Sequence, residues 1–166
     1  MTLQARVGAA RLTVQLDIGI GDAVTPGPQW LEYPSLLEDL PRPRLRAYPR
    51  ETVLAEKLHA MVFLGVRTSR MKDYFDVYAL LREDAMDATQ LARAIAATFA
   101  RRRTALPEAV PGALTDRFAE DETKQAQWQA FLGRNRIEGP TLQEVVAEIR
   151  TRLAAPLAAA REAGAT

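Results

Sequence analysis

The chain has 166 residues, of which 48% are hydrophobic and 26% charged, and this length suits one domain with a sizeable core. It carries 22 basic and 21 acidic side chains, no cysteine and a single histidine, His59. This balance gives no argument for a nucleic-acid or membrane partner, and the counts exclude disulfides, thiol nucleophiles and multi-histidine metal sites. No apolar run approaches the roughly 20 residues of a membrane helix, and the N-terminus lacks a signal-peptide core. We therefore expect a cytoplasmic protein with no membrane partner.

Residues 1–48 have the pattern of strands and loops. In residues 11–19 (RLTVQLDIG) apolar and polar side chains alternate strictly, which predicts a half-buried strand. Its apolar face is formed by Leu12, Val14, Leu16 and Ile18. Further short strands are expected at 30–33 and 45–48, with prolines between them that favour edge positions.

From Thr52 onward the hydrophobic period becomes helical, and helices are expected at about 51–65, 71–83, 88–103, 114–132 and 141–155. A capping box, Thr141 to Glu144, begins the last helix, and Pro156 is expected to end it. The sequence thus predicts an α+β fold. A small sheet of two to four strands (1–48) precedes a domain of about five helices (49–166).

Lys57 is unusual because it lies in the middle of the apolar arc of helix 51–65. A buried ammonium group without a partner is strongly unfavourable, so Lys57 should either extend its amine to solvent or meet an anion. Glu56 and His59 lie on the opposite side of the same helix, and His59 is expected to be an ordinary surface or partner-facing residue.

Asp73 and Asp76 lie one turn apart on the polar side of helix 71–83. They repel each other unless a cation lies between them, and Lys57, Arg70, Lys72 or a divalent metal could supply it. The alternative is a solvated acidic face near a helix N-terminus, where carboxylates are favourable.

Asp17, near a strand end and before a glycine-rich turn, is a further metal-ligand candidate, although one carboxylate alone is weak evidence. The basic cluster 101–103 is expected to complement a helix dipole.

Two motifs resemble one protein family: YPRETVLAEKLHA (48–60) and SRMKDYFDVY (69–78). Both are similar to motifs of the AbiEii-type nucleotidyl transferase toxins, the toxin halves of bacterial abortive-infection toxin–antitoxin pairs. Residues 14–22, 99–107 and 128–132 resemble further segments of the family, so that the resemblance covers most of the chain.

The resemblance implies a polymerase-beta-like core joined to a helical bundle. It also implies transfer of a nucleotidyl group from a nucleoside triphosphate to an acceptor such as tRNA, with Mg²⁺ and with an antitoxin as partner. By motif, Lys57 would be catalytic and contact the triphosphate, Asp73 would be the catalytic carboxylate with Asp76 beside it, and Arg70 and Lys72 would face phosphate. Asp17 would be a metal ligand or general base.

The chain also departs from the family pattern. The family begins with a Gly-Gly/Ser-Thr-Ala-Leu motif followed by Asp-x-Asp, whose aspartates carry the metals, and no Asp-x-Asp occurs in these 166 residues. The resemblance therefore implies a C-terminal portion of such a toxin, or a truncated remnant. The alternative is a non-catalytic module that binds an antitoxin or a complementing chain. Because an incomplete sheet exposes an edge and an apolar face, we expect a homodimer or larger assembly.

Overall fold

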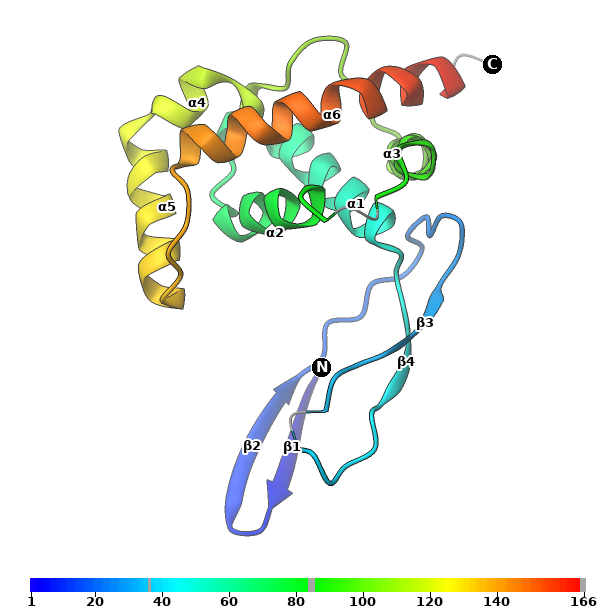
Figure 1. Ribbon diagram of the computed structural model, residues 1–166, viewed down its shortest axis with the longest axis vertical. Coiled ribbons are helices and arrows are strands. Elements are labelled where there is room, and N and C mark those ends of the chain that lie inside the picture. The colour runs from blue at the N-terminus through cyan, green and yellow to red at the C-terminus, as the bar shows by residue number, and fades with distance from the viewer. Residues whose placement is uncertain (36, 84–85, 165–166) are drawn as a thin grey trace.

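The strands form two separate antiparallel hairpins, seen at the bottom of Figure 1, in a computed structural model that describes residues 1–35, 37–83 and 86–164. Strand β1 (Thr2–Val7) pairs with β2 (Ala10–Gln15), and β3 (Gln29–Glu32) pairs with β4 (Arg44–Ala47). The α+β class is confirmed, and the strands are divided between two sheets. Strand β1 was not expected from the sequence, because apolar and polar residues alternate there over only six positions.

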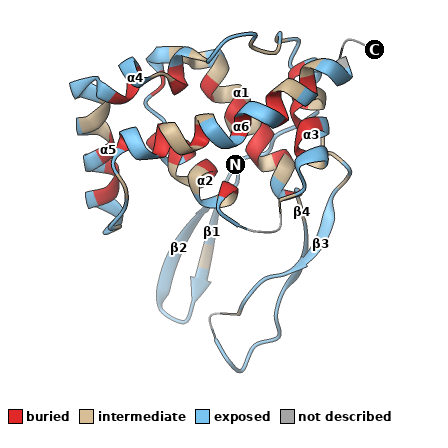
Figure 2. Ribbon diagram, turned by 45° about the horizontal axis from the view of Figure 1, so that its top comes forward, coloured by how far each residue is buried: buried red, intermediate tan, exposed pale blue. Residues whose placement is uncertain are grey.

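The expected half-buried strand at 11–19 is wrong in two respects. Strand β2 ends at Gln15, and its apolar residues are exposed, as the pale hairpins in Figure 2 show. The reason is geometric: two strands alone cannot cover either face of their own ribbon, and the helical part lies to one side.

Six α-helices follow the strands within the described residues. They are α1 (Arg50–Leu64), α2 (Met71–Leu81), α3 (Ala88–Arg101), α4 (Asp116–Glu120), α5 (Glu122–Asn135) and α6 (Leu142–Gly164). Helix α6 crosses the helical part and packs against α2, α3 and α4, while α1 packs against α2 and α3 (Figure 1). Short 3₁₀ turns lie at Gly65–Arg67 and Gly112–Leu114.

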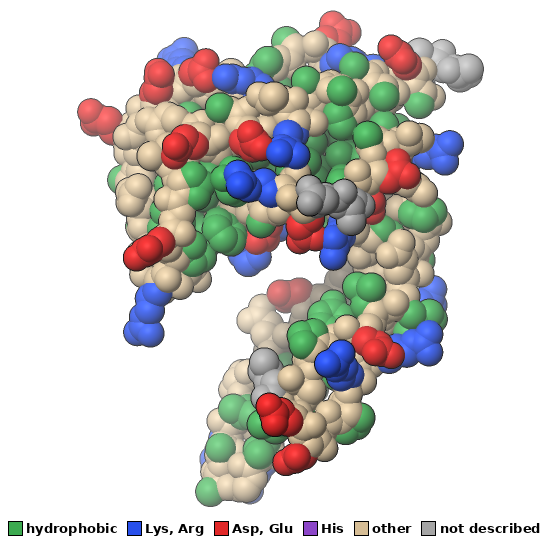
Figure 3. Space-filling view, viewed as in Figure 1, with side chains coloured by type: hydrophobic (Ala, Val, Ile, Leu, Met, Phe, Trp, Pro, Cys, Tyr) green, Lys and Arg blue, Asp and Glu red, His purple; other side chains and the backbone are tan. Residues whose placement is uncertain are grey.

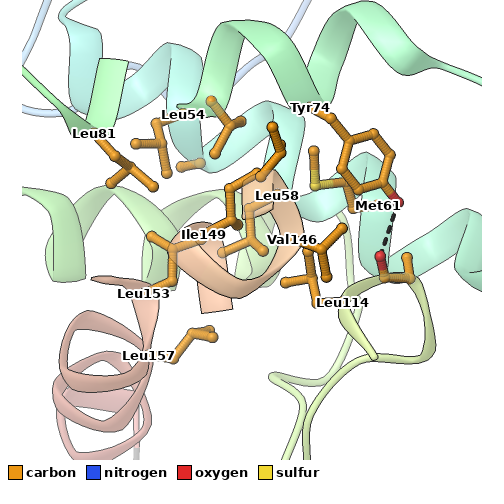
Figure 4. Packing of buried hydrophobic residues seen from close by; sticks show 14 of the residues in the cluster. Leu54, Leu58, Met61, Tyr74, Leu81, Leu114, Val146, Ile149, Leu153 and Leu157 are labelled. Atoms are coloured by element: carbon orange, nitrogen blue, oxygen red, sulfur yellow. Dashed lines mark hydrogen bonds between the residues drawn. The ribbon is translucent and has the colours of Figure 1, made fainter. Parts of the chain in front are cut away.

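The core lies between these helices (Figure 4). Leu54 and Leu58 of α1 belong to the same buried cluster as Ile149 and Leu153 of α6, and all four are fully buried. The hydroxyl of buried Tyr74 donates a hydrogen bond of 2.9 Å to the carbonyl of Ala113, so its polar end has a partner. This core anchors α1 and α2, the helices that carry the Lys57 motif and the Asp73 motif.

Two expectations about helix boundaries are wrong. The single helix expected at 114–132 is divided at Asp121, whose side chain accepts a hydrogen bond of 3.0 Å from the backbone N–H of Lys124 and begins a new helix. Pro156 does not end α6, which continues to Gly164. Proline removes one backbone hydrogen bond, but buried Leu157 and Ala160 hold the following turns against the core.

The predicted capping box is confirmed at the start of α6. The backbone N–H of Thr141 donates to Glu144 Oε2 at 2.7 Å, and the N–H of Glu144 donates to Thr141 Oγ1 at 3.3 Å.

Within the described ranges, no helix has both the length and the apolar character needed to cross a membrane.

Candidate functional site

Helices α1 and α2 form a hairpin that brings two distant motifs together. Gly65 follows α1 with a φ of +55°, a conformation that favours glycine and lets the chain turn. The turn is held from outside by Lys124 of α5, whose amine donates a hydrogen bond of 2.7 Å to the carbonyl of Thr68. As a result, residue 57 of α1 lies opposite residues 73 and 76 of α2.

Lys57 lies between two carboxylates. Its Nζ is 2.7 Å from Asp73 Oδ1 and 2.8 Å from Asp76 Oδ2. Lys72 Nζ also contacts Asp76 Oδ2, at 2.5 Å. The other oxygen of Asp73, Oδ2, lies 2.7 Å from Arg70 Nε, an ion pair without the alignment of a hydrogen bond. These five residues are called the Lys57 cluster below.

Burial makes these ion pairs stronger than ordinary surface pairs. The exposed fractions of the side chains are 20% for Lys57, 6% for Asp73 and 23% for Asp76. Burial alone would lower the pKa of Lys57, but its hydrogen bonds to Asp73 and Asp76 outweigh burial and raise it. At Asp76, burial alone would raise the pKa of the carboxyl, but the hydrogen bonds from Lys57 and Lys72 outweigh burial and lower it. Lys57 is therefore a fixed cation, and Asp73 is not part of a solvated acidic face.

A cleft of about 560 Å³ opens beside the Lys57 cluster. Ten residues line it: Glu56, Lys57, His59, Ala60, Phe63, Leu64, Arg70, Asp73, Arg102 and Thr104. The charged residues that line the cleft are three cations and two carboxylates: Lys57, Arg70, Arg102, Glu56 and Asp73. Figure 3 shows charged side chains of both signs along the lower edge of the helical part, above a hollow that separates it from the hairpins.

A second ion cluster forms another wall of the cleft. Arg102 Nη2 lies 2.9 Å from both Asp22 Oδ1 and Glu56 Oε2, and Tyr48 donates a hydrogen bond of 3.2 Å to Asp22 Oδ2. Beside it, Arg101 donates to the carbonyl of Gly21. Arg102 thus holds the loop after β2 against α1, whereas the sequence predicted only complementation of a helix dipole. Its partner Asp22 is 80 positions away, so spacing along the chain gave no signal for this contact.

His59 is partly buried rather than an ordinary surface residue. Its Nε2 lies 2.9 Å from the hydroxyl oxygen of Thr104, and its ring packs edge-on against buried Phe99 with centroids 5.2 Å apart. Burial is the main cause that lowers its pKa, with a smaller lowering by Arg102 and an opposing effect of Glu56. The burial of His59 could not be predicted from the sequence, because Phe99 lies on α3 and Thr104 follows that helix, far from His59 along the chain.

Asp17 is not among the residues that pair with Lys57 or line the cleft. It lies on the exposed segment after β2, where Oδ1 accepts a hydrogen bond of 3.1 Å from the side chain of Gln15. Residues 1–35, 37–83 and 86–164 contain no group of three or more potential metal ligands. Asp73 and Asp76 are already paired with Lys57, Arg70 and Lys72, so this donor set does not fit a resident Mg²⁺ ion.

Comparison with protein-family models matches most of the chain. The model of a family described as nucleotidyl transferase AbiEii toxin, type IV TA system, matches residues 1–154. Neither the curated proteins nor the solved structures contain a significant match.

Proposed function

Because the chain belongs to the AbiEii nucleotidyl transferase toxin family, a toxin family of type IV toxin–antitoxin systems, we propose that its cleft binds a nucleoside triphosphate. The transfer acceptor in this proposal is a nucleic acid such as tRNA, and the expected protein partner is an antitoxin. The observation that carries the proposal is the position of Lys57, a partly buried cation held between Asp73 and Asp76 at the wall of the cleft.

The charges of the Lys57 cluster suit an anionic ligand. Three cations face two carboxylates, so the Lys57 cluster has one positive charge in excess before any ligand binds, whereas the cluster of Arg102 with Asp22 and Glu56 on the other wall has one negative charge in excess. Arg70 and Lys72 are more than half exposed although each is in an ion pair, and in this proposal both exchange these pairs for contacts with phosphate oxygens. Phosphoryl-type transfer needs fixed cations at the phosphates, because charge develops on the phosphate oxygens in the transition state.

In this proposal Lys57 donates hydrogen bonds to phosphate oxygens and does not act as a base. Its raised pKa, which the two carboxylates maintain against burial, keeps the amine protonated at neutral pH. Asp73 orients the amine and keeps it charged, and Asp76 shares that role with Lys72 as its second partner. The family implies Mg²⁺ as cofactor and Asp17 as its ligand. Since the donor set does not fit a resident ion, no step is assigned to the metal.

The direct test is incubation of the protein with labelled nucleoside triphosphates, Mg²⁺ and tRNA. Incorporation of label by the wild type and by Arg93→Ala, a control at an exposed position of α3, would show that this chain alone completes the transfer. Lys57→Ala should abolish it. Equal incorporation by Lys57→Ala would contradict the proposal. Binding of the triphosphate without transfer would favour a remnant that keeps the site.

A second candidate function, an interaction module, is favoured by the exposed hairpin β1–β2. Leu3 pairs with Val14 across the hairpin, and Leu12 and Leu16 extend the same apolar face; all four are exposed. Such a face favours association with a complementing chain, an antitoxin or a second copy. Sedimentation at micromolar concentration should show a homodimer or larger assembly that Leu12→Ser weakens. A stable wild-type monomer would contradict self-association.

A further inference from the structure

Phe63 is an exposed aromatic ring at the edge of the cleft. Its exposed fraction is 68%, although it lines the same cleft as Lys57, Arg70 and Asp73. A single exposed apolar residue is ordinary on a protein surface. This ring is distinctive because it shares a concave site that holds several charged side chains with the Lys57 cluster.

The position of Phe63 along α1 suits a ligand with a charged end and a flat apolar end. Residues 57 and 63 are six positions apart on one helix, so they are offset by about 9 Å along its axis. Ala60 lies between them and also lines the cleft. Its small side chain leaves room for a linking group between the charged wall and the ring. A nucleoside triphosphate has this arrangement, with ribose between phosphates and base.

The ring of Phe63 is supported from behind. Phe63 and His59 are nearly parallel, with an interplanar angle of 16° and centroids 5.9 Å apart. His59 is held in turn by a T-shaped contact with buried Phe99 and by the hydroxyl of Thr104. Because burial lowers the pKa of His59, its ring is largely neutral at neutral pH. The stack is therefore a fixed aromatic surface rather than a cation.

We propose that Phe63, stacked on His59, is the platform on which the base of the bound nucleotide stacks. This inference rests on the proposed function, since it assumes that the Lys57 cluster holds the phosphates. It adds that the chain recognises the nucleoside part of its ligand by a planar apolar contact. Stacking of this kind tolerates all four bases because every base has a π-face.

The test compares nucleotides with a ligand that has phosphates but no base. Calorimetric titrations in Mg²⁺ buffer would use the four nucleoside triphosphates and inorganic tripolyphosphate. The variants are Phe63→Ala, Phe63→Trp and the control Val110→Ala, an exposed apolar position outside the cleft. Because Phe63 is exposed, its variants should fold, and circular dichroism would verify this.

The expected result is a loss specific to the base. Phe63→Ala should weaken nucleotide binding by about ten-fold, within the range of base–aromatic stacking, and leave tripolyphosphate binding unchanged. Phe63→Trp and Val110→Ala should bind nucleotides at least as well as the wild type.

Other results would overturn the inference. If Phe63→Ala bound nucleotides as the wild type does, or lost tripolyphosphate equally, the platform would be refuted while the phosphate site stood. If the wild type bound neither ligand, the proposed function would fail together with the platform.

Discussion

Substitution of Lys57 by methionine should destabilise the protein substantially, although the substitution keeps an unbranched side chain of similar length. The change removes the cation that Asp73 and Asp76 share at 2.7 and 2.8 Å. Asp73 is only 6% exposed, so its charge cannot be rehydrated without opening the contact between α1 and α2. The two carboxylates, one turn apart on α2, would also repel each other.

The size of the effect follows from burial. Removing one partner of a fully buried ion pair costs about 3–5 kcal/mol. Lys57 keeps some solvent contact, and Arg70 and Lys72 still face the two carboxylates, so we expect a smaller loss, about 2–3 kcal/mol of unfolding free energy. For a chain of this size that corresponds to a fall in Tm of about 4–12 °C.

Urea denaturation and thermal melting of the wild type, Lys57→Met and Arg50→Met would measure this. Arg50 is a matched control because it also lies on α1 and forms an ion pair, with Glu83. In contrast to Lys57 and Asp73, these two side chains are 55% and 45% exposed. An exposed pair contributes about 0–1 kcal/mol. If Lys57→Met lost no more stability than Arg50→Met, the ion pairs of Lys57 with Asp73 and Asp76 would contribute no more than an exposed surface pair.

Three further outcomes are expected. The pKa of Asp76 is lowered on folding, so its contribution to stability is complete above the ordinary value of 3.8 and is lost as the pH falls through the folded pKa. When stability is measured as a function of pH, the loss of unfolding free energy caused by Lys57→Met should therefore shrink below pH 3.8. A loss that does not depend on pH would argue against this coupling. Tyr74→Phe should lower the unfolding free energy by about 1 kcal/mol in urea titrations, because the carbonyl of Ala113 loses its buried hydrogen bond; no change would show that bond to be immaterial. Pro156→Ala should raise the unfolding free energy by about 1 kcal/mol, since it restores a helix N–H at the expense of buried ring contacts, and a lower Tm would mean that those contacts dominate.

Much of the helical half could be predicted from the sequence because its signals are local. The apolar period located the helices, and Thr141 with Glu144 marked the start of α6 through a contact three residues long. Local rules failed where long-range packing decides the outcome. Pro156 lies inside a helix because the residues after it are buried against the core. The alternation at 11–19 indicated a strand but could not show whether another layer covers it.

The candidate site shows the same division. Lys57 was identified by its apolar surroundings, and Asp73 with Asp76 by their one-turn spacing; the hairpin of α1 and α2 brings the three together. The residues that complete the cleft, among them Arg102 and Phe63, gave no comparable signal. Arg102 pairs with Asp22 and Glu56 on other elements, and such contacts leave no periodic pattern. Phe63 is an exposed residue of α1, and helical periodicity does not distinguish it from an ordinary surface residue.

The most direct test of the central claim is the affinity of a nucleoside triphosphate for the wild type and for Lys57→Gln, measured by equilibrium dialysis with Arg50→Gln as control. If Lys57 holds the phosphates, its charged hydrogen bonds contribute about 1.5–3 kcal/mol, so Lys57→Gln should bind at least ten-fold more weakly while Arg50→Gln binds as the wild type does. Equal affinity of Lys57→Gln and the wild type would contradict the assignment of the cleft as a triphosphate site.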